Sequence, residues 1–192
     1  MNSNRHILKF FFELGQLRKI KREGWRFAAV EQPESVAEHT LRTAQIGYFL
    51  ALLEKYKDPY EGCTIALFHQ IGECRIGDLH KVAQRYIEVN EEKVVHNQLQ
   101  PLAKMGESLM KVWKQGEYQK TEAGKIARDA DLLELAVTAK EYVDRGYEEA
   151  MDMIHNTKKR LYTKSARQLL QELERVHSSD WWRNLKKFND VK

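Results

Sequence analysis

The sequence predicts an all-α protein, a bundle of about six to eight helices. Three observations support this fold class. Only three prolines and ten glycines occur among 192 residues, which leaves little room for the many tight turns of a β-sandwich. Apolar residues recur at helical spacing, and no segment shows sustained alternation. The length fits one ordinary domain. We therefore expect a single domain over residues 1–192, with a core at about 5–175 and a C-terminal extension at 176–192.

The expected helices follow from this spacing and from residues that begin and end helices. The first covers 5–20, where apolar residues repeat about every 3.6 positions. A second begins after Ser35, because Ser35 and Glu38 form a capping-box sequence, and continues through Leu53. Asp58 and Pro59 start a third over 60–73. Further helical stretches are expected over 79–87, 90–115 with a break at Pro101, 121–145, 147–160, 163–177 and 181–188.

Composition and charge narrow the classes of function. The formal net charge is only +4, and acidic residues are interleaved with basic ones, so nucleic acid is not an expected partner. No stretch has the roughly 20 apolar residues that a membrane span needs. Cys63 and Cys74 form neither a CxxC pair nor a disulfide framework. We expect a cytoplasmic protein that does not bind membranes.

Two histidines stand out because of their surroundings. A lone histidine beside an apolar stripe, such as His39, is more often a satisfied interior residue than a ligand. His69, however, follows four apolar residues at 65–68, and burying its imidazole is costly unless both nitrogens find partners. Glu73 lies four residues after His69, which would place it on the same face of a continuous helix. It could orient the imidazole or act on a bound substrate.

Asp131 lies in an equally apolar stretch. A carboxylate there is expensive unless it is paired or bound to a metal. Asp129 is a rival that spacing alone does not exclude. Two imidazoles and one carboxylate suit one divalent metal ion, such as Mn, Co, Mg or Zn. Such an ion lowers the pKa of water and polarises a phosphoryl oxygen.

These stretches resemble the H…HD…D pattern of the HD-domain phosphohydrolases, and most closely the 5′-deoxynucleotidase branch. The similarity extends over about residues 5–175. It rests on Gly24-Trp25, on 33–39 (PESVAEH), on 66–73 (ALFHQIGE) and on 77–79 (GDL). The resemblance implies an HD-type helical bundle, one divalent ion, a nucleoside monophosphate substrate and a homodimer.

The resemblance also implies a role for each matching residue. The metal ligands would be His39, His69 and Asp131, with Gln70 at the position of the remaining ligand. Glu73 would be the catalytic carboxylate. Asp78 would support the reaction or contact the sugar. The substrate would be bound by Trp25, which lines the nucleotide pocket, and by Arg22, which holds the phosphate.

Gln70 departs from the family pattern, which has aspartate after the second histidine. Glutamine is neutral and one methylene longer, so we expect weaker metal affinity and weaker or lost hydrolysis. The leading interpretation is a metal-dependent phosphohydrolase that removes phosphate from (deoxy)nucleoside 5′-monophosphates. The alternative is a catalytically inactive HD-fold protein that binds nucleotide or metal. A third interpretation is a helical scaffold whose polar residues are only structural. Metal analysis of the purified protein would distinguish it from the other two.

Two further features stay open. The basic run around Trp25 is either the solvated end of a helix or an edge that faces phosphate. It consists of Arg18, Lys19, Lys21, Arg22 and Arg26. Trp181 and Trp182 resemble a docking patch, which in this family would serve a dimer interface.

Overall fold

The computed structural model describes residues 3–183 and residue 185. Within them the chain forms ten α-helices and no strand, so the all-α prediction is confirmed. An isolated bridge pairs Lys21 with Ser35. The helices are α1 (Ser3–Leu14), α2 (Val36–Leu53), α3 (Pro59–Phe68), α4 (Glu73–Ile76), α5 (Glu91–Leu99), α6 (Lys104–Tyr118), α7 (Glu122–Val143), α8 (Met151–Lys158), α9 (Lys164–Leu173) and α10 (Asp180–Arg183).

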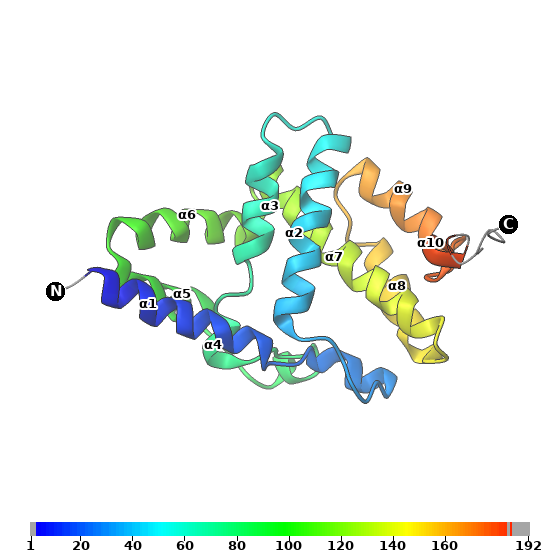
Figure 1. The fold of residues 1–192 in the computed structure, drawn as a ribbon, viewed down its shortest axis with the longest axis horizontal. Coiled ribbons are helices and arrows are strands. Elements are labelled where there is room, and N and C mark those ends of the chain that lie inside the picture. The colour runs from blue at the N-terminus through cyan, green and yellow to red at the C-terminus, as the bar shows by residue number, and fades with distance from the viewer. Residues whose placement is uncertain (1–2, 184, 186–192) are drawn as a thin grey trace, which may run out of the picture.

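Helices α2, α3 and α7 form the centre of the molecule (Figure 1). The pair α2 and α3 runs side by side, and α7 packs against both. Gly47 and Gly62 permit the close approach of α2 and α3, because a Cβ at Gly47 would lie 3.2 Å from the Gly62 carbonyl oxygen. Helices α1, α5 and α6 gather on one side of this centre, and α8, α9 and α10 on the other (Figure 1).

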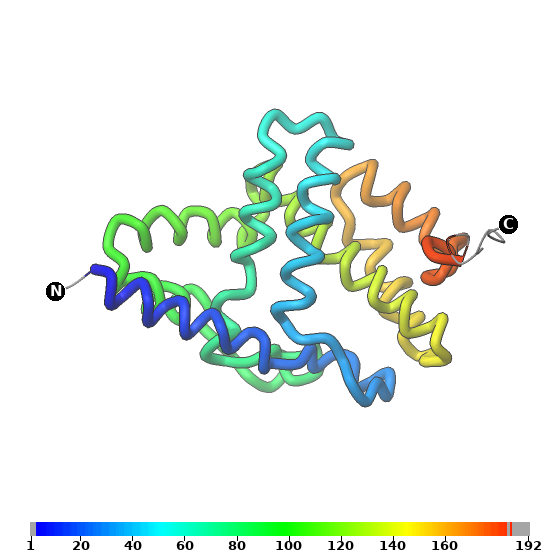
Figure 2. Tube along the Cα trace, in the orientation of Figure 1, coloured from blue at the N-terminus to red at the C-terminus, as the bar shows by residue number. Residues whose placement is uncertain are grey.

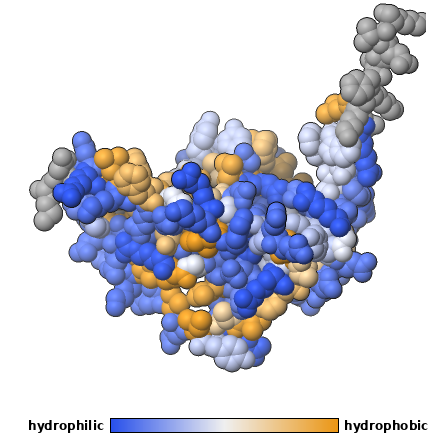
Figure 3. All heavy atoms as spheres, turned by 60° about the horizontal axis from the view of Figure 1, so that its bottom comes forward, coloured by the Kyte–Doolittle hydropathy of each residue, from blue (hydrophilic) through white to orange (hydrophobic). Residues whose placement is uncertain are grey.

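The hydrophobic core follows the same division. A cluster around α7 includes Trp25, Leu50 and Ile154. A second cluster, with Phe10 and Trp113, joins α1, α5 and α6. The surface shown in Figure 3 is mostly hydrophilic, with hydrophobic side chains gathered in limited areas. None of the described helices is both long and apolar enough to span a membrane.

Helix starts were predicted well. Ser35 and Glu38 make the expected capping box: the Ser35 hydroxyl accepts from the Glu38 N–H, and the Glu38 carboxylate accepts from the Ser35 N–H. Asp58 caps α3 with Pro59 in its first turn. The break near Pro101 is also present, between α5 and α6.

Several expected helices are shorter in the structure. Helix α1 ends at Leu14, and a 3₁₀ turn (Gly15–Arg18) follows. The stretch 79–87 contains only the 3₁₀ turn Ala83–Arg85. Near the C-terminus, α9 ends at Leu173 and α10 spans Asp180–Arg183. The rest of the helix expected over 181–188 lies largely outside the described residues.

The helix expected over 60–73 is the main correction, because α3 ends at Phe68. In the segment after Phe68 the backbone N–H groups of residues 73–75 donate to carbonyl groups three residues back instead of four, and two side chains from later helices donate to carbonyl groups of the same segment. Trp113 Nε1 donates to the His69 carbonyl at 3.2 Å, and Gln98 Nε2 donates to the Ile71 carbonyl at 2.9 Å. The chain then runs on to α4 near α1, where Arg75 pairs with Glu13 (Figure 2).

Candidate metal centre and active site

Three helices bring His39, His69 and Asp131 together. His39 lies in α2, His69 is the C-terminal cap of α3, and Asp131 lies in α7. One ligand atom from each lies within 4.8 Å of the others. Asp131 Oδ1 is 3.1 Å from His39 Nε2 and 3.7 Å from His69 Nε2. The structure thus assembles the three residues that the sequence singled out.

The two histidines both direct Nε2 at Asp131. His69 Nδ1 contacts the Ala66 carbonyl oxygen at 2.5 Å. A carbonyl only accepts, so Nδ1 carries the hydrogen and Nε2 has a free lone pair. This Nε2 is buried without a hydrogen-bond partner in the described chain. Two imidazole nitrogens and a carboxylate, one nitrogen unpartnered, fit a divalent transition metal with open positions.

Asp131 and Asp129 have separate roles in the structure. Both are buried in α7. The Asp129 carboxylate accepts from the backbone N–H groups of Tyr162 and Thr163, at 2.8 and 2.7 Å, and so fixes the start of α9. Asp131 instead faces the histidines, and its Oδ2 accepts from Arg128 at 2.5 Å. Of the two aspartates, Asp131 is therefore the one that lies with the histidines, and its role as a metal ligand stays a prediction.

Charges around the site support an ionised Asp131. Burial raises the pKa of Asp131, but the interactions with the imidazoles of His39 and His69 outweigh it and hold the pKa well below its usual value. Burial and the charge of Arg22 lower the pKa of His39, while hydrogen bonds to Asp131 and Glu134 raise it overall. Asp131 therefore keeps the negative charge that a cation would need.

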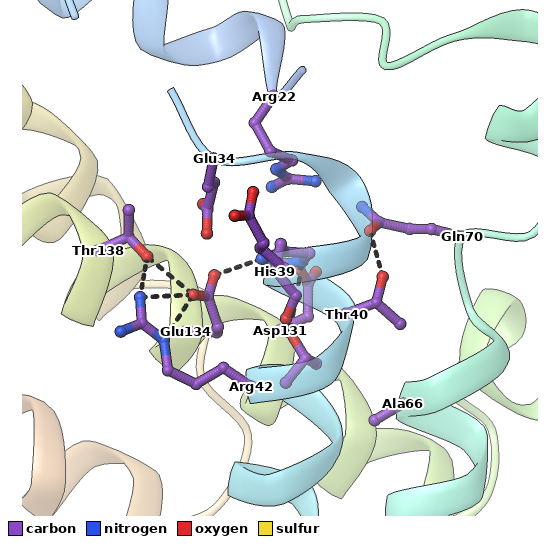
Figure 4. Close-up of polar contacts among 12 residues, drawn as sticks. Arg22, Glu34, His39, Thr40, Arg42, Ala66, Gln70, Asp131, Glu134 and Thr138 are labelled. Atoms are coloured by element: carbon purple, nitrogen blue, oxygen red, sulfur yellow. Dashed lines mark hydrogen bonds and ion pairs between the residues drawn. The ribbon is translucent and has the colours of Figure 1, made fainter. Parts of the chain in front are cut away.

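Arg22 lies close enough to the three candidate ligands for its charge to interact with Asp131. Its guanidinium is largely buried and points toward the His39 region in Figure 4. Burial lowers the pKa of Arg22, but the charges of Asp78, Asp131, Glu73 and Glu34 raise it overall. An arginine held among carboxylates, next to a metal-type donor set, is suited to bind a phosphate group.

Asp78 supports this loop. Its Oδ2 accepts from the Glu23 backbone N–H at 2.6 Å, and its Oδ1 lies 4.0 Å from Arg22 NH1. The carboxylate therefore fixes the backbone beside Arg22 and lies within charge-pairing distance of the guanidinium. The predicted role of Asp78, to support the reaction or contact the sugar, stays a prediction.

Glu73 does not share a helical face with His69, because α3 ends before it and Glu73 begins α4. That part of the prediction was wrong. Its Oε2 is nevertheless buried without a hydrogen-bond partner in the described chain. Burial, and secondarily the charge of Asp78, raises the pKa of Glu73 to about 8. A carboxyl group titrating near neutral pH is suited to move a proton.

Trp25 is placed differently from the prediction. It is only 2% exposed, packs in the core, and meets Tyr142 edge to face at 4.9 Å. A base could stack on the indole only if the ring were uncovered. Its Nε1 donates to Glu34 Oε1 at 3.1 Å. Trp25 thus orients Glu34, whose pKa is raised to about 7 by burial and by the charge of Glu134.

Gln70 is turned toward α2. Its Oε1 accepts from the Thr40 hydroxyl at 3.3 Å, and Figure 4 shows the side chain directed at Thr40. The fourth ligand implied by the family pattern is thus engaged with another side chain.

The sequence interpretation missed two sets of residues. Glu134 is fully buried and contacts His39 Nδ1, and the argument that singled out Asp131 in its apolar stretch applies equally to it. The second set is a group of basic residues near Asp131 that are far apart in sequence. The charges of Arg128 and Arg160 act with burial to lower the pKa of Lys81, and Asp131 interacts with all three.

An all-α bundle with two histidines and one carboxylate beside a buried arginine defines a helical protein with a candidate metal centre. A family model described as "HD domain" matches residues 14–176. The chain therefore belongs to the HD domain family.

Curated relatives agree with this assignment. The 5′-deoxynucleotidase HDDC2 of Homo sapiens is 27% identical over 92% of this chain and 88% of its own length. The protein of the same name from Dictyostelium discoideum is 31% identical over 71% of this chain and 77% of its own.

Solved structures share the fold. A conserved hypothetical protein from Pyrococcus furiosus has a TM-score of 0.71 and 28% identity, covering 88% of this chain and 99% of its own. The HD phosphohydrolase DatZ of cyanophage S-2L, solved with dA and one catalytic Zn²⁺ ion, has a TM-score of 0.56 and 17% identity. This match covers 85% of the present chain and 94% of DatZ. At that identity it supports the fold alone.

Proposed function

We propose that this chain is a metal-dependent phosphohydrolase that removes phosphate from nucleoside 5′-monophosphates, with deoxynucleotides as the first substrates to test. The observation that carries the proposal is the convergence of His39 Nε2, His69 Nε2 and Asp131 Oδ1 within 4.8 Å. Relatives named 5′-deoxynucleotidase support the substrate class.

The charges near the site support a phosphate ligand. Arg22 is a largely buried cation, and Arg128 forms an ion pair with Oδ2 of Asp131. Lys81 and Arg160 add positive charge close enough to act on Asp131. Basic groups from separate parts of the chain, gathered beside a metal-type donor set, favour a substrate with a doubly charged phosphate.

One divalent ion, held by His39, His69 and Asp131, would supply Lewis acidity toward the phosphoryl group; its identity among Mn, Co, Mg and Zn is open. Arg22 offsets charge on the phosphoryl oxygens, and Asp78 fixes the loop that carries Arg22. Water attacks phosphorus and the bond from phosphorus to the sugar oxygen breaks, and the departing oxygen takes up a proton, so that the products are the nucleoside and inorganic phosphate. Glu73 Oε2 takes the proton of the attacking water.

Gln70 favours a second candidate, an inactive protein that still binds nucleotide or metal. Its amide adds no negative charge to the site, and its oxygen is turned to Thr40. Substitution by aspartate would add one unit of charge beside the cation and should strengthen metal binding. The family's homodimer and a cytoplasmic location also stay predictions.

The test is a phosphate-release screen over nucleoside monophosphates with added Mn, Co, Mg and Zn, run on this chain and on Gln70→Asp, with metal content measured in parallel. We expect metal-dependent release from both, with roughly 10-fold or more gained by Gln70→Asp. His69→Asn serves as the inactive control.

If only Gln70→Asp releases phosphate while both chains bind metal, the result would favour an inactive protein that binds nucleotide or metal. Equal metal affinity and activity in both chains would contradict the weakening ascribed to Gln70. No metal in either would leave the scaffold interpretation.

A further inference from the structure

A buried chain of polar contacts lies behind His39, away from Asp131. His39 Nδ1 contacts Glu134 Oε2, and both side chains are completely buried. The other oxygen of Glu134 accepts from Arg42 Nε at 2.9 Å and from the Thr138 hydroxyl at 2.8 Å. Figure 4 shows these residues converging on Glu134 from α2 and α7.

The chain continues to the surface through Glu141. Arg42 NH1 donates to Glu141 Oε1 at 2.7 Å, and Arg42 NH2 donates to Glu141 Oε2 at 3.2 Å. A planar guanidinium bound by two carboxylates has little freedom to rotate. Arg42 is thereby fixed, and it fixes Glu134 in turn.

Helical spacing places these groups in register. His39 and Arg42 lie three residues apart on α2, and Glu134 and Thr138 lie four apart on α7. Asp131 precedes Glu134 by three residues on the same helix. One face of α7 therefore supplies both a carboxylate for the centre and a carboxylate for the histidine that faces it.

The contact determines which nitrogen of His39 is free. A carboxylate only accepts hydrogen bonds, and His39 faces one on each ring nitrogen, Glu134 at Nδ1 and Asp131 at Nε2. The contact with Glu134 is the shorter of the two, so the single hydrogen of the neutral ring belongs on Nδ1. The neutral ring then has its lone pair on Nε2, the atom 3.1 Å from Asp131 Oδ1. Carboxylates of this kind orient histidine ligands in metal sites generally.

We propose that Glu134 is a positioning residue that holds His39 as the Nδ1–H form with Nε2 directed at the centre, and that Arg42 keeps Glu134 in place. The inference rests on the proposed function, because it takes His39 as a metal ligand. A purely structural link between α2 and α7 would stabilise the fold without affecting how tightly His39 binds a metal, and this difference provides the test.

Glu134→Gln separates the two explanations. Arg42 and Thr138 both donate to one oxygen of Glu134, so the amide of a glutamine must place its oxygen there. Its NH₂ group then faces His39 Nδ1, which must become an acceptor. The neutral ring would carry its hydrogen on Nε2, the atom that a metal needs free.

The tautomer is read by long-range ¹H–¹⁵N NMR on the metal-free chain with labelled histidine. Spectra are taken over a range of pH so that the neutral ring is seen, and the signal is assigned by its loss in His39→Asn. We expect Nδ1–H in the wild type and Nε2–H in Glu134→Gln. Co²⁺ affinity, followed by visible absorption, should fall about 10- to 100-fold.

Asp129→Asn is the matched control, because it removes another buried carboxylate of α7 that contacts the start of α9 and not His39. It should lower stability and leave the His39 tautomer and Co²⁺ affinity unchanged. An Nε2–H ring in the wild type overturns the proposal, even where Glu134→Gln does not fold. Unchanged tautomer and affinity in Glu134→Gln overturn it as well. A wild type that neither binds Co²⁺ nor releases phosphate sinks the proposed function, while the tautomer still decides the role of Glu134.

Discussion

His39 and His69 present the same nitrogen to Asp131 from opposite kinds of local structure. His39 lies in the first turns of an uninterrupted helix, and its Nδ1 contacts a buried carboxylate with partners on both oxygens. His69 lies where a helix ends, and its Nδ1 contacts only a backbone carbonyl. The first histidine is part of an ionic network, and the second depends on an interrupted backbone.

The two regions also differ in how many of their buried polar atoms lack a hydrogen-bond partner. Around His39, both oxygens of Glu134 have partners. Around His69, its own Nε2 and Glu73 Oε2 are buried without hydrogen-bond partners among the residues that the structure describes. Unsatisfied buried polar atoms cost stability unless something binds them. The His69 region therefore holds the atoms left for a ligand, whereas the His39 region provides the rigid support.

Replacing each histidine in turn should show the largest difference between the two regions. His39→Asn and His69→Asn should both abolish metal binding, but His39→Asn also leaves one buried oxygen of Glu134 without its partner, while Arg42 still pairs with the other. We expect His39→Asn to cost about 3 kcal/mol of unfolding free energy, and His69→Asn about 1 kcal/mol. Urea denaturation of the metal-free variants measures both. Equal costs would show that the Glu134 network contributes no special stability.

Glu73→Gln tests how much the buried, unpartnered carboxylate near His69 destabilises the fold. The folded pKa is about 8, above the ordinary 4.5, so the folded state favours the protonated form. Below about pH 4.5 both states are protonated and no penalty exists; stability then falls as the pH rises toward 8, where the full penalty is present. Glutamine removes this loss, so we expect a gain on the order of 2 kcal/mol at pH 8.5. The gain should be smaller at pH 5.5.

Thermal and urea unfolding of the metal-free chain at both pH values measures this effect, and phosphate release should be lost at the same time. Glu88→Gln is the control, because Glu88 is exposed. A Glu73→Gln chain whose stability relative to wild type does not change with pH would contradict the burial of an unpartnered carboxyl.

The two histidine regions also differ in how far the sequence predicts them. The start of α2 depends on Ser35 and Glu38, which lie three residues apart, so local chemistry is enough to place His39. The end of α3 depends on Gln98 and Trp113, which are distant in sequence and donate to the carbonyls near His69. Local periodicity contains no sign of these donors, and it predicted a continuous helix.

The same reasoning explains the carboxylates of α7. Asp129 and Asp131 have similar neighbours in sequence, and only the packing of Tyr162 and Thr163 separates a structural role from a ligand role. Glu134 could have been singled out by its apolar neighbours, but its partners Arg42 and Thr138 follow only from the packing of α2 on α7. The family resemblance predicted the candidate ligands, whereas the side chains that hold them in place could be identified only from the structure.

The smallest expected effect is on Co²⁺ affinity, when one tryptophan hydrogen bond is removed near His69 or near Glu34. Trp113→Phe keeps an aromatic ring but removes the donor to the His69 carbonyl, and Trp25→Phe removes the donor to Glu34. Each should cost about 1–2 kcal/mol in urea denaturation, because the smaller ring leaves a cavity at a buried position in addition to the lost hydrogen bond. Only Trp113→Phe should weaken Co²⁺ binding, by about 2- to 5-fold, because His69 depends on the interrupted backbone that Trp113 maintains. Equal Co²⁺ affinity in the two variants would mean that the end of α3 is set by the packing of the ring alone. Weaker binding by Trp25→Phe would mean that Glu34 contributes to the centre.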